Sequence, residues 1–138
     1  MTVYYRNGYR NQLVRAVAFH LPERLWPDEF VELEYISLDA AGVLVISKGY
    51  AWDGASGPTA DWPAKQIVVP SLIHDALCQL GRAGKMRSVA DHRKHTDRLF
   101  YDLLRERGMN IIRAAIWYRG VRIGSLMDGD NKPIKEAS

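Results

Sequence analysis

The sequence predicts an α+β fold, in which a small antiparallel sheet from the N-terminal third packs against three C-terminal helices. Three observations lead to this prediction. Strand-like alternation occurs before residue 48, apolar positions recur at helical spacing after residue 71, and a stretch rich in glycine, proline and tryptophan lies between. The chain has 138 residues, the size of one domain. We expect this domain to span residues 1–127, followed by a polar tail at residues 128–138.

The predicted sheet is built from three segments. In residues 30–38, Val31, Leu33 and Tyr35 alternate with Glu32, Glu34 and Ile36, which is typical of one half-buried strand. A turn at residues 39–42 leads into the β-branched run at residues 43–47, so the two segments form a predicted hairpin. Residues 13–19 are the predicted third strand.

Residues 49–70 are predicted to form a long ordered loop that lies over the seam between the sheet and the helices. Its glycines, prolines and two tryptophans are too closely spaced for a regular element. A loop of this length inside one domain is commonly functional, and its tryptophans argue against disorder. We therefore expect a binding site here.

Three helices follow the loop. Ser71 is the predicted cap of the first, which should end near Gly81 and Gly84. Ser88 caps the second, which should run to about Arg107 before Gly108. The third should begin at Asn110 and end at Gly124, with its buried face formed by Ile112, Ala115, Ile116, Tyr118 and Ile123.

Composition limits the function classes. The net charge of +3 is spread along the chain, which gives nucleic-acid binding no particular support. The chain contains no apolar run near the ~20 residues that a membrane span needs and no signal-peptide pattern at its start, so we expect a cytoplasmic protein. Cys78 is the single cysteine, so a metal site would need histidine and carboxylate ligands.

The loop supplies the first candidate site. Asp53-Gly54 and the Ser56-Gly57 step favour tight turns, which leave backbone amides and carbonyls available to a ligand or a cation. We expect Trp52, Asp53, Gly54 and Ser56 to bind a ligand. The alternative is that Asp53 only forms a turn that closes the sheet.

His74 and Asp97 are the candidate catalytic residues. His74 flanks the apolar stripe of the first helix, and Asp97 lies on the apolar face of the second, three residues before Phe100. Each would need a polar partner, so we expect the two side chains to be in contact, with Asp97 orienting the imidazole. The alternative is a buried ion pair between Asp97 and an arginine; the candidates are Arg113, Arg119 and Arg122.

A weaker group consists of Asp91, His92 and His95. Asp91 and His95 are four residues apart and share a helix face, a spacing that can bind a divalent metal. The surrounding stretch is rich in charges of both signs, which is more typical of a solvated face. We therefore leave this group out of the main site.

Four ordered motifs together resemble the phage and prophage family catalogued as domain of unknown function 1353. They are KGYAWDGASGP at residues 48–58, LIHDAL at 72–77, TDRLF at 96–100 and YRGVRIG at 118–124. The resemblance covers roughly residues 43–124. This chain departs from the family pattern at Cys78, where a tyrosine is usual, and at Gly57, where an aliphatic residue is common. The family implies a phage context and brings no established activity.

The His74-Asp75 step and the distant Asp97 are also similar to the arrangement in secreted phospholipases of the A2 class. That likeness implies His74 as the base that activates water and Asp97 as the residue that orients it. It also implies that Asp75 and the loop would bind a divalent cation, which is the cofactor this likeness suggests.

The sequence thus leaves three hypotheses open. The first is a phage or prophage accessory protein with a hydrolase-like His/Asp site that acts on an ester or amide of a small molecule. The second is a non-catalytic phage protein, either a virion component or a binder of a host or phage protein, whose Asp/His cluster is a structural network. The third is a nucleic-acid binder that uses Arg113, Arg119 and Arg122.

Overall fold

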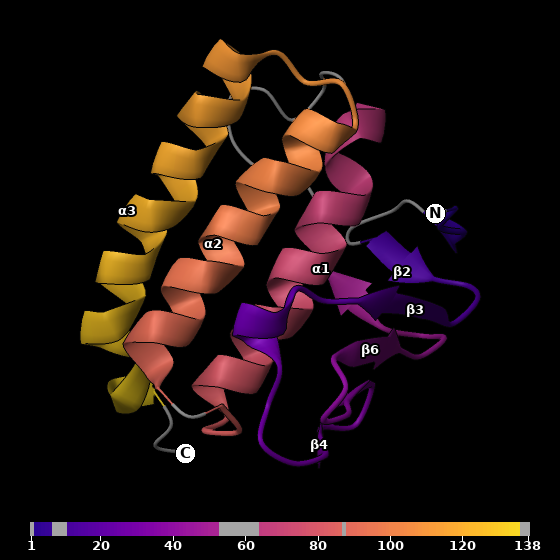
Figure 1. Ribbon diagram of the computed structural model, residues 1–138, viewed down its shortest axis with the longest axis vertical. Helices are drawn as coiled ribbons and strands as arrows, with labels where there is room; N and C mark the ends of the chain where they lie inside the picture. The colour runs from indigo at the N-terminus through magenta and orange to yellow at the C-terminus, as the bar shows by residue number, and fades with distance from the viewer. Residues whose placement is uncertain (1, 7–10, 53–63, 87, 136–138) are drawn as a thin grey trace.

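A computed structural model shows the α+β architecture that the sequence predicted (Figure 1). It describes residues 2–6, 11–52, 64–86 and 88–135. The helices are α1 (Ala64–Arg82), α2 (Val89–Glu106) and α3 (Ile111–Lys135). In Figure 1 they lie side by side with α2 in the middle, and the strands lie beyond α1. No described helix is long and apolar enough to cross a membrane.

The strands form two small antiparallel sheets in the described residues. One has the order β1-β2-β7 and the other the order β3-β6-β5-β4. The predicted strand at residues 13–19 is wrong as one element, because β2 ends at Leu13 and β3 begins at Val17 in the other sheet. The bounds are β1 (Tyr5–Arg6), β2 (Asn11–Leu13), β3 (Val17–His20), β4 (Val31–Glu32), β5 (Ile36–Leu38), β6 (Val43–Ile46) and β7 (Ala51–Trp52), with a short 3-10 helix η1 (Glu23–Leu25) between β3 and β4.

The single strand predicted at residues 30–38 is a hairpin. Leu33 and Ile36 exchange backbone hydrogen bonds of 2.8 and 3.4 Å, which close a turn between β4 and β5. The turn interrupts the alternation, so Ile36 is buried in the core while Tyr35 is exposed. The prediction failed because two short strands joined by a tight turn keep an alternating pattern in the sequence.

The turn predicted at residues 39–42 is confirmed, and it joins β5 to β6. The Asp39 carboxylate accepts hydrogen bonds from the backbone N–H groups of Ala41 and Val43, at 3.0 and 2.9 Å. Gly42 has a φ of +88°, in the left-handed region that favours glycine. The Trp26 ring lies directly against this glycine and donates its indole N–H to the Leu21 carbonyl at 2.7 Å.

The first helix begins earlier than predicted. It starts at Ala64 instead of Ser71 and contains Pro70, so residues 64–70 are not loop. A proline inside a helix costs ~3 kcal/mol or more, but burial of Ile67 and Val69 offsets this cost. The other end of the predicted loop is also partly regular, because residues 51 and 52 form β7. Residues 53–63 of the predicted loop lie outside the described residues.

The second helix is as predicted. Ser88 accepts a hydrogen bond from the Asp91 N–H at 3.2 Å, and the helix ends at Glu106, before Gly108 with its φ of +93°. Its apolar stripe packs in the core, as expected from Leu99, Phe100, Leu103 and Leu104.

The third helix differs from the prediction in length and in orientation. It continues past Gly124 to Lys135, because a glycine in a helix costs only about 1 kcal/mol and need not end it. The predicted buried face is wrong, since Ile112, Ile116 and Ile123 are exposed. The face toward α2 carries Ala114, Trp117 and Val121 instead. The domain boundary at residue 127 stays a prediction.

The described residues form two apolar clusters. The larger one joins both sheets to α1 and α2 and includes the fully buried Trp52. The smaller one lies among the three helices and contains Ile67, Phe100, Leu104, Met109 and Ala114.

The contact between Gly42 and Trp26 predicts a large effect of Gly42→Ala. A Cβ at this position would lie 2.1 Å from the indole nitrogen, in addition to the backbone strain of a positive φ. Gly84→Ala is the matched control, because Gly84 also has a positive φ, of +75°, but a Cβ there meets nothing within 4 Å. We expect Gly84→Ala to cost about 1–2 kcal/mol and Gly42→Ala clearly more in urea denaturation. Equal losses would contradict the packing argument.

Candidate functional site

His74 and Asp75 are adjacent on α1 but serve different sides of the helix. Successive helical residues are separated by about 100°. As a result, the His74 side chain meets Asp97 on α2, whereas Asp75 meets Tyr50, which immediately precedes β7. The described residues therefore hold two separate polar clusters, one on each side of α1.

The first cluster is centred on Asp97, whose side chain is 0% exposed. His74 Nε2 donates to Asp97 Oδ1 at 2.7 Å, which confirms the contact predicted from the sequence. Arg93 Nε donates to the same oxygen at 2.9 Å, and Arg122 Nη1 donates to Oδ2 at 2.8 Å. The carboxylate is thus bonded on both oxygens by cationic groups that come from all three helices.

The electrostatics of the cluster favour a protonated His74. Desolvation by burial acts to lower its pKa, but the hydrogen bond to Asp97 and the neighbouring Cys78 sulfur outweigh it and raise the pKa of His74 from 6.5 to about 9. His74 therefore carries a proton on both ring nitrogens at neutral pH. In this state it donates hydrogen bonds and cannot accept a proton.

Cys78 and Phe100 complete the surroundings of the imidazole. The Cys78 sulfur lies 3.8 Å from both ring nitrogens, so it is on the lone-pair axis of neither. This position differs from that of a cysteine nucleophile bonded to a histidine base. The Phe100 ring packs against His74 with centroids 5.1 Å apart, and Cys78 itself is buried.

The second cluster holds α1 against the sheet. The Tyr50 hydroxyl donates to Asp75, and Gln79 Nε2 donates to the Tyr50 oxygen at 2.9 Å and to Asp75 at 3.3 Å. One turn earlier, the buried Trp52 donates its indole N–H to Ser71 Oγ at 3.1 Å. The Asp75 carboxylate therefore already accepts hydrogen bonds from two side chains of the protein.

The predicted cation site at Asp75 depends on residues that lie outside the described part of the chain. Asp53, Gly54 and Ser56 belong to this part, so their position relative to Asp75 stays a prediction. Within the described residues, no group of three or more histidine, cysteine or acidic side chains could hold a metal ion. This statement includes Asp91 and His95, whose spacing alone suggested a metal.

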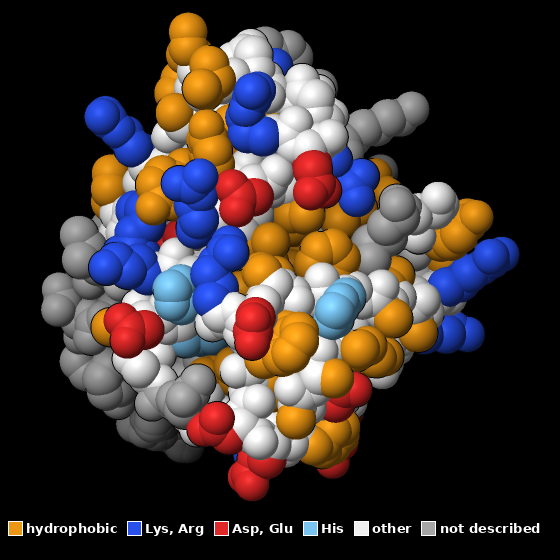
Figure 2. All heavy atoms as spheres, in the orientation of Figure 1, with side chains coloured by type: hydrophobic (Ala, Val, Ile, Leu, Met, Phe, Trp, Pro, Cys, Tyr) orange, Lys and Arg blue, Asp and Glu red, His pale blue; other side chains and the backbone are white. Residues whose placement is uncertain are grey.

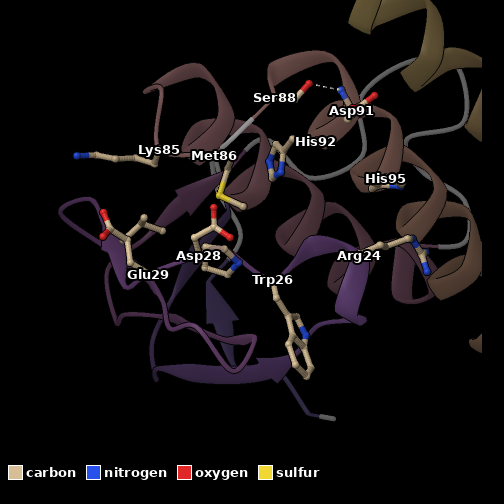
Figure 3. A pocket seen from close by; sticks show the side chains of 12 residues that line it. Arg24, Trp26, Asp28, Glu29, Lys85, Met86, Ser88, Asp91, His92 and His95 are labelled. Carbon is tan, nitrogen blue, oxygen red and sulfur yellow. Dashed lines mark hydrogen bonds between the residues drawn. The ribbon is translucent and has the colours of Figure 1, made fainter.

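A groove of about 730 Å³ lies between the η1–β4 segment and the start of α2 (Figure 3). Neither His74 nor Asp97 lines it. In its wall, His92 Nε2 donates to the Leu77 carbonyl at 2.7 Å, and burial lowers the pKa of His92. The lining mixes both signs of charge and consists of Arg24, Trp26, Pro27, Asp28, Glu29, Val31, Lys85, Met86, Ser88, Asp91, His92 and His95.

Sequence reasoning identified part of the first cluster. Arg122 was among the candidate partners of Asp97, whereas no bond joins Asp97 to Arg113 or Arg119 among the described residues. Arg93 was missed because it lies in a stretch that looked solvated, although its spacing of four residues from Asp97 is a signal for an ion pair. Tyr50 lies in the first of the four motifs but was not assigned a role, and Gln79 carried no signal that separates it from ordinary surface residues.

A family model matches the part of the chain that contains most of the four sequence motifs. The model described as "Protein of unknown function (DUF1353)" matches residues 30–121, about two thirds of the chain. The chain belongs to this family. The matched part of this DUF1353 protein includes three of the four residues of the Asp97 cluster, namely His74, Arg93 and Asp97. The fourth, Arg122, is the residue that follows the match. No curated protein and no solved structure matches the chain.

The pKa of His74 predicts a stability that depends on pH. Because the folded pKa of about 9 lies above the ordinary 6.5, protonated His74 stabilises the fold fully below pH 6.5. This contribution is lost as the pH rises towards 9. We expect the free energy of unfolding to fall by on the order of 3 kcal/mol across this range. His74→Asn should remove that part of the pH dependence.

The measurement is urea denaturation of the parent protein and of His74→Asn at a series of pH values. His20→Asn is the control, because it removes an exposed histidine in the sheet region. The same pH profile for the parent and His74→Asn would show that His74 is not the titrating group.

Proposed function

We propose that this DUF1353 protein is a non-catalytic interaction protein in which the Asp97 cluster is structural. The observation that carries this proposal is the complete burial of the Asp97 carboxylate between three cationic side chains. A charge buried in this way is expensive unless it is paired, so the cluster constrains how the helices can pack.

The partners of Asp97 connect α2 to both neighbouring helices. His74 links α2 to α1, and Arg122 links α2 to α3. Arg93 reinforces the second link, because its Nη2 also donates to the Val121 carbonyl of α3 at 3.2 Å. These bonds support a structural role, since they fix the relative positions of the three helices.

The state of His74 also supports a non-catalytic role. A general base works best when its pKa lies near the operating pH, because it must be unprotonated to accept a proton. With a pKa of about 9, almost all His74 is protonated at neutral pH. Its side chain is only 14% exposed, which restricts access by a substrate.

We further propose that the protein acts in a phage or prophage context and binds a phage or host protein. The order of the four motifs supports the context, and the lack of a described membrane-crossing helix is compatible with action in the host cytoplasm or on the virion. Phage genes flanking this gene in its genome of origin are the expected observation.

A hydrolase that uses His74 and Asp97 is the second candidate function. The 2.7 Å bond between the two side chains favours it, because a carboxylate that orients an imidazole is a recurring arrangement in hydrolases. In this function His74 would have to lose its proton before it activated water.

The structural role predicts that Asp97→Asn is strongly destabilising. The change keeps the shape of the side chain but removes the negative charge that offsets three cations. We expect a loss of about 3–5 kcal/mol in urea denaturation. Asp102→Asn is the control on the same helix, because Asp102 is 40% exposed and pairs with Arg24 and Arg98. We expect the control to cost less than about 1 kcal/mol; similar losses for both variants would contradict the structural role.

The same proposal predicts no ester hydrolysis. The parent protein and His74→Asn are incubated with a chromogenic short-chain ester, both at neutral pH and above the His74 pKa of about 9. We expect both proteins to match a buffer blank at neutral pH. Hydrolysis by the parent that His74→Asn abolishes would establish the hydrolase and overturn the non-catalytic function.

A further inference from the structure

The outer face of α3 exposes large apolar side chains. Ile112, Ile116 and Ile123 are 70%, 64% and 58% exposed, and Ile111 beside them is 58% exposed. Arg119 and Gly120 lie on the same face and are also exposed. We call Ile112, Ile116, Arg119, Gly120 and Ile123 the isoleucine face. Apolar patches of this kind are uncommon on surfaces that contact only water.

The high exposure of these side chains shows that no described element covers this face. α3 is the outermost helix, and it packs on α2 through the opposite side, which carries Ala114, Trp117 and Val121 (Figure 1). In Figure 2, hydrophobic side chains are visible along the α3 edge with basic side chains beside them. The second apolar stripe of α3 is therefore available for an external contact.

The spacing of the isoleucine face suits another helix. Ile112, Ile116, Arg119 and Ile123 follow one another at intervals of four, three and four residues, the spacing of a coiled-coil seam. Within the same face, a Cβ placed on Gly120 would meet nothing within 4 Å, so a second backbone can approach closely there. An exposed glycine also weakens the helix, by about 1 kcal/mol relative to alanine.

The charges of α3 indicate what that helix would carry. The sequence between Ile111 and Met127 contains three arginines and no acidic residue. Arg119 lies in the middle of the seam and, among the described residues, has no hydrogen-bond or ion-pair partner. An arginine at a seam position is most favourable opposite a carboxylate.

From these observations we propose that the isoleucine face binds an acidic amphipathic helix of a partner protein. The apolar side of that helix covers the isoleucines, and an aspartate or glutamate in its seam pairs with Arg119. This inference rests on the proposed interaction function and names the surface and the chemistry of its partner.

Two other occupants fit the face less well. A second copy would place one arginine-bearing, acid-free face against another, so the like charges would repel. A lipid surface would bury the whole length of the apolar stripe, and Arg119 lies partway along it, between Ile116 and Ile123, instead of at one end. A helix with an acidic seam position avoids both problems.

The test uses two synthetic heptad-repeat peptides with the same leucine seam, one flanked by glutamates and carrying a glutamate at a central seam position, the other with lysines at these positions. Binding to the full chain is measured by fluorescence anisotropy of the labelled peptides. We expect the parent protein to bind the acidic peptide at least about tenfold more tightly than the basic one.

Three variants locate the interaction. Arg119→Glu should reverse the preference between the peptides, and Ile116→Ser should weaken binding of the acidic peptide by about tenfold or more. Both positions are exposed, so circular dichroism should show unchanged folding. Lys48→Glu is the control, since it makes the same charge change at an exposed position next to the sheets and should leave the preference unchanged.

Several outcomes would overturn the proposal. They are equal or absent binding of the two peptides, a preference that survives Arg119→Glu, binding to phosphatidylserine vesicles instead of the acidic peptide, and a dimer in sedimentation that Ile116→Ser dissociates. The test is independent of the proposed non-catalytic function. Ester hydrolysis that depends on His74 would overturn that function, whatever the peptides do, and failure of the peptides leaves the Asp97 result unchanged.

Discussion

The burial of one carboxylate constrains the arrangement of the whole helical layer. Asp97 lies on the inner side of α2, where water cannot solvate its charge, so the protein must supply the compensating cations. Those cations come from α1, from α2 itself and from α3. The apolar cluster around Phe100 and Leu104 also joins the three helices, but apolar packing alone would tolerate small rotations. The directional bonds to Asp97 favour one arrangement, and the same hydrogen bond from His74 helps to raise the pKa of the imidazole against the opposing effect of burial.

The helix α1 mediates between the two halves of the molecule. One side of it meets the Asp97 cluster through His74, and another side meets the sheet through Asp75, Gln79 and Ser71. Two neighbouring residues that look like one motif in the sequence therefore belong to different interfaces. This division accounts for the His-Asp step in structural terms, because each residue compensates the buried polar group of a different neighbour.

In the same arrangement, no element that the structure describes covers the outer side of α3. The inner side of this helix carries Ala114, which is fully buried, with Trp117 and Val121 packed against the same cluster. The isoleucines remain on the outside with Arg119, in a helix that contains no acid before Asp128. In the proposed interaction function, the Asp97 cluster fixes the position of α3, and the exposed side of α3 binds the partner.

The sequence by itself determined those features that depend on local signals. The serine cap and the terminal glycine of α2 gave both of its ends correctly, because caps act over a few residues. The contact between His74 and Asp97 was also predictable, since a polar group on an apolar stripe requires a partner. Tertiary structure decided the rest. The start of α1 before Pro70 depends on burial of Ile67, and the side of α3 that faces inward depends on which helix is available to cover it. Arg93 shows the same limit. An arginine four residues from an aspartate has the same sequence pattern whether the helix face is solvated or buried. Arg93 belongs to the core cluster because α3 packs beside it and accepts its second hydrogen bond.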